Sequence, residues 1–82
     1  MYYDDLLEII DNELKILDGC EVKDLFIEKF GSGSVINMNK ALKKLRHDDK
    51  VCSHQEGRRI YYWSIKIKKA VNIKKFMKSR KN

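Results

Sequence analysis

The chain has 82 residues, of which 18 are Lys or Arg and 12 are Asp or Glu, so its formal net charge is +6. This length fits one domain and excludes architectures that need separate cofactor and substrate halves. An apolar fraction of 43% argues against wholesale disorder. No apolar run approaches the roughly 18 residues that cross a bilayer. The acidic pair Asp4 and Asp5 stands where a signal peptide needs basic residues, so we expect an intracellular chain with no membrane partner.

The charge is distributed unevenly along the chain. Residues 1–30 have a net charge of −6, residues 31–65 of +4, and residues 66–82 carry eight bases and no acid. Lysines also keep small proteins soluble. A segregation this steep nevertheless favours a basic surface that faces a polyanion.

The N-terminal third has the pattern of two helices. Apolar residues recur at helical spacing from Asp4 to Leu17, and Asp18-Gly19 is expected to end this first helix. The segment Cys20–Val22 is too short for a helix and is expected to form a brief strand. Lys23–Phe30 is expected to be a second, short helix.

A third helix is expected from about Val35 to Asp48, after a turn at Gly31-Ser32-Gly33 and an N-cap at Ser34. One stripe of this helix, centred on Met38, is apolar. The opposite side is basic and bears amides; it holds Ile36, Asn37, Lys40, Lys43, Lys44 and His47, with Asn39 at its edge.

The period then changes from helical to alternating. Val51–Gln55 and Arg59–Ile65 are expected to be strands joined by a hairpin loop at Glu56–Arg58. Tyr61 and Trp63 share one strand face and are expected in the core rather than in a base-stacking platform. In the tail, apolar residues between Ala70 and Met77 predict a short basic helix that docks on the domain or on a second subunit.

This order of elements is that of a winged helix-turn-helix. The segment Asn39–Arg46 and on to Val51 resembles the recognition helix of bacterial and archaeal winged-helix repressors. The segment Glu56–Tyr62, where a Gly-Arg turn precedes a Tyr-Tyr pair, is similar to the wing of ArsR-type regulators. The resemblance implies an α+β fold. The resemblance covers roughly residues 20–65. The expected architecture is a three-helix bundle with a two- or three-stranded wing over residues 1–65, followed by a basic, helical C-terminal extension over 66–82.

The expected function is sequence-specific binding of double-stranded DNA by a small transcription regulator. The third helix would enter the major groove, and the Arg-rich wing would contact the backbone. A lone domain of this size binds modestly, so we expect a homodimer, with the first helix and the tail as candidate dimer surfaces. The expected DNA-binding residues are Ser34, Asn37, Asn39, Lys40, Lys43, Lys44, Arg58 and Arg59.

Two other functions stay open at this point. Winged helices also serve as protein–protein interaction modules in transcription and replication assemblies. Asn39 followed by Trp63 is also similar to Z-form nucleic-acid-binding domains. In those domains a Tyr stands where this chain has Lys43, and a Pro-Pro pair precedes the Trp, whereas this chain has no proline.

The sequence offers little for catalysis or metal binding. It contains no phosphate-binding Gly loop, and a domain this small has little room for a catalytic pocket, so we expect no enzyme, cofactor or small-molecule substrate. His47 and His54 lack companions at metal-ligand spacing. The single Cys20 and Cys52 do not match the metal sites of ArsR-type sensors, and we expect both to be reduced, packed small hydrophobes.

Overall fold

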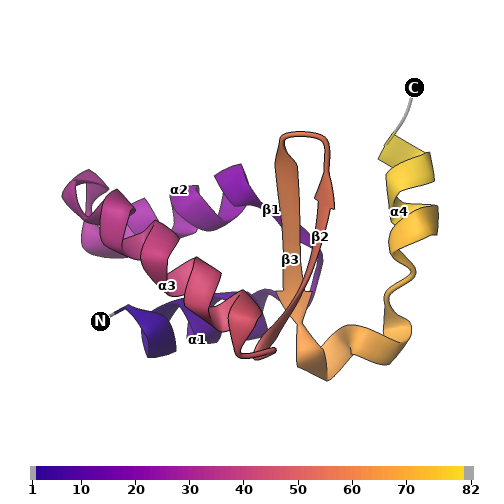
Figure 1. Ribbon diagram of the computed structural model, residues 1–82, viewed down its shortest axis with the longest axis horizontal. Helices are drawn as coiled ribbons and strands as arrows, with labels where there is room; N and C mark the ends of the chain where they lie inside the picture. The colour runs from indigo at the N-terminus through magenta and orange to yellow at the C-terminus, as the bar shows by residue number, and fades with distance from the viewer. Residues whose placement is uncertain (1, 81–82) are drawn as a thin grey trace.

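The computed structural model describes residues 2–80 and contains helices and one small antiparallel sheet, which confirms the α+β class (Figure 1). The elements in chain order are α1 (Tyr3–Glu13), β1 (Leu17–Asp18), α2 (Gly19–Phe30), the 3-10 turn η1 (Ser32–Ser34), α3 (Val35–His47), β2 (Val51–Glu56), β3 (Arg59–Ser64), the 3-10 helix η2 (Ile65–Ala70) and α4 (Ile73–Arg80).

The sheet has the strand order β1-β3-β2. The β2–β3 hairpin pairs Val51 with Ser64 at its base and Glu56 with Arg59 at its tip, and both strands agree with the prediction to within one residue. Gly57 lies in the turn with φ of 61°, a conformation that glycine adopts without strain. Because β3 is central, its side chains alternate between two covered faces.

Helices α1, α2 and α3 cover one face of the sheet and form the core with it. The core consists of Leu6, Ile9, Ile10, Leu17, Val22, Phe26, Met38, Ala41, Leu42, Leu45, Val51 and Tyr62. Full burial of a large apolar side chain contributes about 1.5–3 kcal/mol, so this cluster is the main stabilising feature of the fold. Tyr2 closes one end of it, with its ring edge-on to Phe26 at 4.9 Å.

The first helix is shorter than predicted. It ends at Glu13, because Leu14 adopts a left-handed conformation with φ of 52° and its side chain is 58% exposed. Leu17 is buried, but as a residue of β1 that pairs with Tyr62 of the central strand. The spacing of Leu14 and Leu17 therefore mimics a helical stripe that the chain does not form.

The predicted helix stop at Asp18-Gly19 and the predicted strand at Cys20–Val22 are both wrong. Asp18 is the N-cap of α2: its Oδ1 accepts from the Glu21 amide at 2.8 Å, and Glu21 Oε1 accepts from the Asp18 amide at 3.2 Å. This reciprocal capping box stabilises the helix start, so α2 begins at Gly19 and includes residues 20–22. Cys20 consequently lies exposed on α2, contrary to the packed position expected for it.

The predicted N-cap at Ser34 is wrong in its mechanism, although α3 begins at the predicted residue. Ser34 precedes α3 but makes no side-chain cap hydrogen bond. Its Oγ instead shares a 3.0 Å hydrogen bond with the Tyr2 hydroxyl, which ties the start of α3 to the start of α1.

The C-terminal segment covers the other face of the sheet. Tyr61 and Trp63 are buried as predicted, but they lie outside the core cluster formed with the helices. The ring of Phe76, in α4, contacts Tyr61 edge-on at 5.7 Å. The tail thus docks on its own domain, with α4 beside the hairpin and away from α1, α2 and α3 (Figure 1).

Candidate nucleic-acid interface

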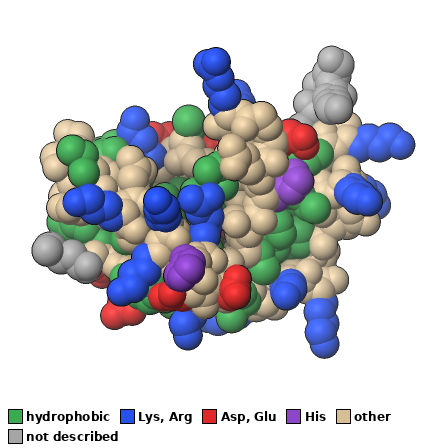
Figure 2. Space-filling model, in the orientation of Figure 1, with side chains coloured by type: hydrophobic (Ala, Val, Ile, Leu, Met, Phe, Trp, Pro, Cys, Tyr) green, Lys and Arg blue, Asp and Glu red, His purple; other side chains and the backbone are tan. Residues whose placement is uncertain are grey.

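Helix α3 has one buried and one exposed face. Its apolar stripe, which comprises Met38, Ala41, Leu42 and Leu45, is buried in the core. The opposite face exposes Asn37, Asn39, Lys40, Lys43, Lys44 and His47. Lys and Arg side chains gather along this helix on the face that Figure 2 shows. The amphipathic pattern therefore presents a basic surface that the rest of the fold leaves uncovered.

The lysines of α3 are free of acidic partners. The ion pairs between described side chains include His54–Glu56 and Lys66–Asp11, and no described carboxylate lies within 4.0 Å of Lys40, Lys43 or Lys44. Counterions from the solvent that accompany such exposed lysines can be displaced by a polyanion.

A notch on this surface brings together three of the expected residues. Asn37, Lys40 and Lys44 line it with Tyr3 of α1. Lys44 Nζ lies over the Tyr3 ring, 5.5 Å from its centroid, and the Tyr3 hydroxyl donates to Asp48 Oδ2 at 2.9 Å. Desolvation, followed by this hydrogen bond, raises the pKa of Tyr3, so the hydroxyl remains a donor at neutral pH. Tyr3 thus orients the lysine, a role that no local sequence pattern indicates.

The other expected residues are placed less uniformly. Asn39 and Lys43 are exposed but do not line the notch. Ser34 is half-buried and bonded to Tyr2, so its hydroxyl is already engaged. Ile36, in the first turn of α3, is 72% exposed and adds an apolar group to the basic face.

The hairpin tip carries the second group of expected residues. Arg58 and Arg59 are exposed at the end of the β2–β3 hairpin. They also line a shallow hollow of about 270 Å³ together with Asp18 and Gly19, at the start of α2. The two arginines are therefore displayed on a protruding turn, apart from the notch on α3.

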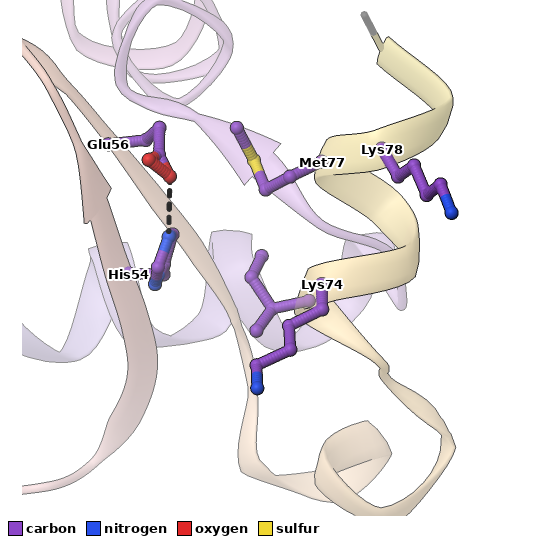
Figure 3. A pocket seen from close by; sticks show the side chains of 6 residues that line it. His54, Glu56, Lys74, Met77 and Lys78 are labelled. Carbon is purple, nitrogen blue, oxygen red and sulfur yellow. Dashed lines mark hydrogen bonds and ion pairs between the residues drawn. The ribbon is translucent and has the colours of Figure 1, made fainter.

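A groove separates the hairpin from the C-terminal helix (Figure 3). It has a volume of about 350 Å³ and is lined by His54 and Glu56 of β2 and by Lys74, Met77 and Lys78 of α4. His54 Nε2 lies 3.4 Å from Glu56 Oε1. The groove thus places one paired histidine and carboxylate beside two lysines of α4.

Neither a metal-ligand cluster nor a membrane-spanning helix is found within residues 2–80. No group of three or more His, Cys, Asp or Glu side chains there is arranged to hold a metal ion. Over the same range, no helix combines the length and apolar character that crossing a membrane requires.

Comparisons of the chain with protein-family models, with curated proteins and with solved structures found no match.

Proposed function

We propose that this chain is a winged helix-turn-helix protein that binds duplex DNA in a sequence-specific manner as a small transcription regulator. Its order of elements, with three helices before a hairpin and a sheet ordered β1-β3-β2, is compatible with that fold. In this proposal α3 is the recognition helix and the β2–β3 hairpin is the wing.

The observation that carries the proposal is the free basic face of α3. Lys40 and Lys44 are exposed, unpaired with any described carboxylate, and grouped with Asn37 around one notch. A helix fits the major groove of B-DNA, where lysine can contact guanine and an amide can bond bidentately to adenine. Asn39 and Lys43 lie on the flank of this face, and Arg58 and Arg59 on the wing would contact phosphates.

Dimerisation on a symmetric site belongs to the same proposal, because one domain of this size contacts few base pairs. With the apolar side of α4 resting on its own sheet, α1 is the favoured dimer surface. Within α1, Asp4 and Glu8 are exposed, so the surface that would face the partner is acidic in part.

A protein–protein interaction module is the second candidate, and one observation favours it. The 72% exposure of Ile36 is unusual for a purely electrostatic surface, and an apolar group there suits a protein partner as well as a thymine methyl group. The two candidates differ in their response to salt, since only binding to DNA releases many counterions.

A salt titration of duplex binding tests the proposal. Replacing Lys40 and Lys44 together with Ala should reduce the salt slope by about two phosphate equivalents if both contact phosphates. The matched control replaces Lys15 and Lys23, which are exposed outside α3, and should leave most of the slope in place. Equal losses in the two variants, or no salt-dependent binding by the parent protein, would contradict a recognition role for α3.

Experiments with two kinds of duplex then distinguish sequence-specific binding from nonspecific binding and from Z-form binding. An unlabelled duplex that carries a selected site should displace labelled random duplex from the protein at a far lower concentration than unlabelled random duplex does. Circular dichroism of an alternating CG duplex should keep its right-handed signal on addition of protein; its inversion would favour the Z-form binder instead.

A further inference from the structure

A second basic hollow lies where α3 ends, between β2, β3 and η2. Its volume is about 650 Å³, and Arg46, Asp49, Cys52, Trp63 and Lys68 contribute to its lining. We call it the Arg46 hollow. The expected DNA-binding residues do not include any of these side chains, and Lys40, Lys43 and Lys44 do not line it.

Two hydrogen-bond donors in this region lack acceptors. Among the side chains that the structure describes, the buried nitrogen and oxygen atoms without a hydrogen-bond partner are Arg46 Nε and Trp63 Nε1. Both residues line the Arg46 hollow, and Trp63 as a whole is only 8% exposed. Native proteins rarely leave buried donors unsatisfied, so two such donors on residues that line one hollow call for an acceptor from outside the chain.

The charges around the hollow favour an anionic acceptor. Arg46 is half-buried, yet no carboxylate of the described residues lies within 4.0 Å of its guanidinium group. Lys68 supplies a second cation, and its charge acts on the neighbouring Cys52 thiol. Asp49 opposes them with one negative charge, which leaves the hollow with a net charge of +1 when Cys52 is neutral.

Cys52 is uncharged at neutral pH. Burial is the main influence on this thiol and raises its pKa, Lys68 lowers it, and Asp49 raises it. The thiol therefore neither pairs with the two cations nor repels an anion. A partly buried cation without a counter-ion is unfavourable, and an oxyanion would relieve both the charge and the unmet donors.

We propose that the Arg46 hollow binds a phosphate-like oxyanion through Arg46 and Lys68, with the Trp63 indole as an additional donor. The unprotonated oxygens of such an anion accept hydrogen bonds, whereas guanidinium, ammonium and indole N–H groups only donate. The anion is either a free phosphate or a phosphate of a nucleic-acid backbone. Since the hollow is separate from the outward face of α3, the site does not depend on base readout by that helix.

Titration of the full chain with inorganic phosphate, followed by ¹H–¹⁵N NMR at constant ionic strength, tests the site. Trp63 is the single tryptophan, so its indole N–H signal is unambiguous. We expect a saturable shift of this signal and of the backbone amides of residues 49–53 and 65–68. Replacing Arg46 with Gln should weaken the phosphate affinity about tenfold, the loss of one charge-assisted contact.

Lys68 provides the matched pair of variants. Lys68→Gln should weaken phosphate binding, whereas Lys69→Gln removes the same charge from an exposed neighbour outside the hollow and should not. If Arg46→Gln does not fold, the comparison of Lys68→Gln with Lys69→Gln tests the site on its own. Equal affinities in those two variants, or an indole signal that responds no more to phosphate than to chloride, would overturn the site.

A duplex titration of the same variants identifies the source of the anion. If the anion is a backbone phosphate, duplex DNA shifts the indole signal and free phosphate competes with it. If the site takes free phosphate, duplex leaves the indole signal unchanged while inorganic phosphate still moves it. The phosphate arm contains no DNA, so loss of duplex binding alone contradicts the proposed function and leaves this site standing.

Discussion

Helices α3 and α4 are both short, basic and amphipathic, but the fold holds them in different ways. Four residues of α3 are buried among α1, α2 and the sheet. None of the described side chains of α4 is buried; Ile73, Phe76 and Met77 are half-covered where they rest on the outer face of the hairpin. The stripe of α3 is enclosed on several sides, whereas α4 meets the domain on one side.

This difference separates two tasks that lysine-rich helices perform. Reading a base sequence requires side chains at fixed positions, and a helix locked into the core provides them. Attracting a polyanion requires only positive charge within a Debye length, which a loosely docked helix supplies equally well. If the proposed function holds, recognition therefore belongs to α3 and long-range attraction to the tail.

The largest expected effect is on stability, from one truncation in each helix. Leu45→Ala should lower the free energy of unfolding by about 2–5 kcal/mol, because the Leu45 side chain is 0% exposed. Phe76→Ala should cost only about 1–2 kcal/mol, because part of that ring is already in water. Urea unfolding measures both. Equal costs would show that α4 is anchored as firmly as α3.

Removal of residues 66–82 should affect binding more than folding. The truncated chain has a net charge of −2 instead of +6, so its affinity for duplex DNA should fall strongly. Loss of the Phe76–Tyr61 contact, and of Lys68 from the hollow that Trp63 lines, should also lower the melting temperature and shift the Trp63 emission to the red.

A charge-only variant separates these two consequences. Replacing Lys74, Lys75 and Lys78 with Gln keeps the apolar contacts of α4 but removes three exposed charges. It should weaken DNA binding while the melting temperature and the Trp63 emission stay close to those of the parent. A truncation that leaves melting and emission unchanged would mean that the tail contributes only charge.

A smaller effect is expected at the junction between the helical core and the tail. Ser64 is fully buried; its Oγ donates to Asp11 Oδ1 at 2.7 Å and accepts from the Lys66 amide at 3.0 Å. Ser64→Ala should cost about 1–3 kcal/mol, because it leaves polar partners unsatisfied. Ser79→Ala, on the exposed side of α4, should change stability by less than about 0.5 kcal/mol. A larger loss of melting temperature in Ser79→Ala than in Ser64→Ala would contradict a stabilising role for the Ser64 hydrogen bonds.

The smallest expected effect is a decline of stability at alkaline pH. Burial raises the pKa of Cys52 above its ordinary 9.0 and that of Tyr62 above its ordinary 10.0, although Arg46 lowers the latter in part. Folding favours both protonated forms, so their contribution is complete below about pH 9 and is lost as the pH rises through the raised values. Cys52→Ala and Tyr62→Phe should each flatten the fall in unfolding free energy between pH 9 and 11. A fall that stays equally steep in both variants would exclude these two groups as its cause.

Local patterns determined much of this protein. The period of 3.6 in residues 35–47 and the alternation on either side of Gly57 predicted α3 and the hairpin to within one residue. The capping box of Asp18 and Glu21 is also a local signal, and it outweighs the tendency of Gly19 to end a helix. Spacing likewise placed Asn37, Lys40 and Lys44 on one face of α3.

Tertiary structure decided what each buried residue meets. Leu17 has the spacing of a helix residue, but its partner Tyr62 is 45 positions away, and pairing with it ends α1 early. Tyr61 and Trp63 are as apolar as Tyr62, yet only Tyr62 faces the helical core. Tyr3 beside Lys44 is also a contact between distant segments, and Arg46 and Trp63 line the same hollow only because the chain folds back. Hydrophobic spacing indicates that a side chain will leave water, whereas the partner is set by whichever long-range packing excludes the most water and leaves the fewest polar groups unpaired.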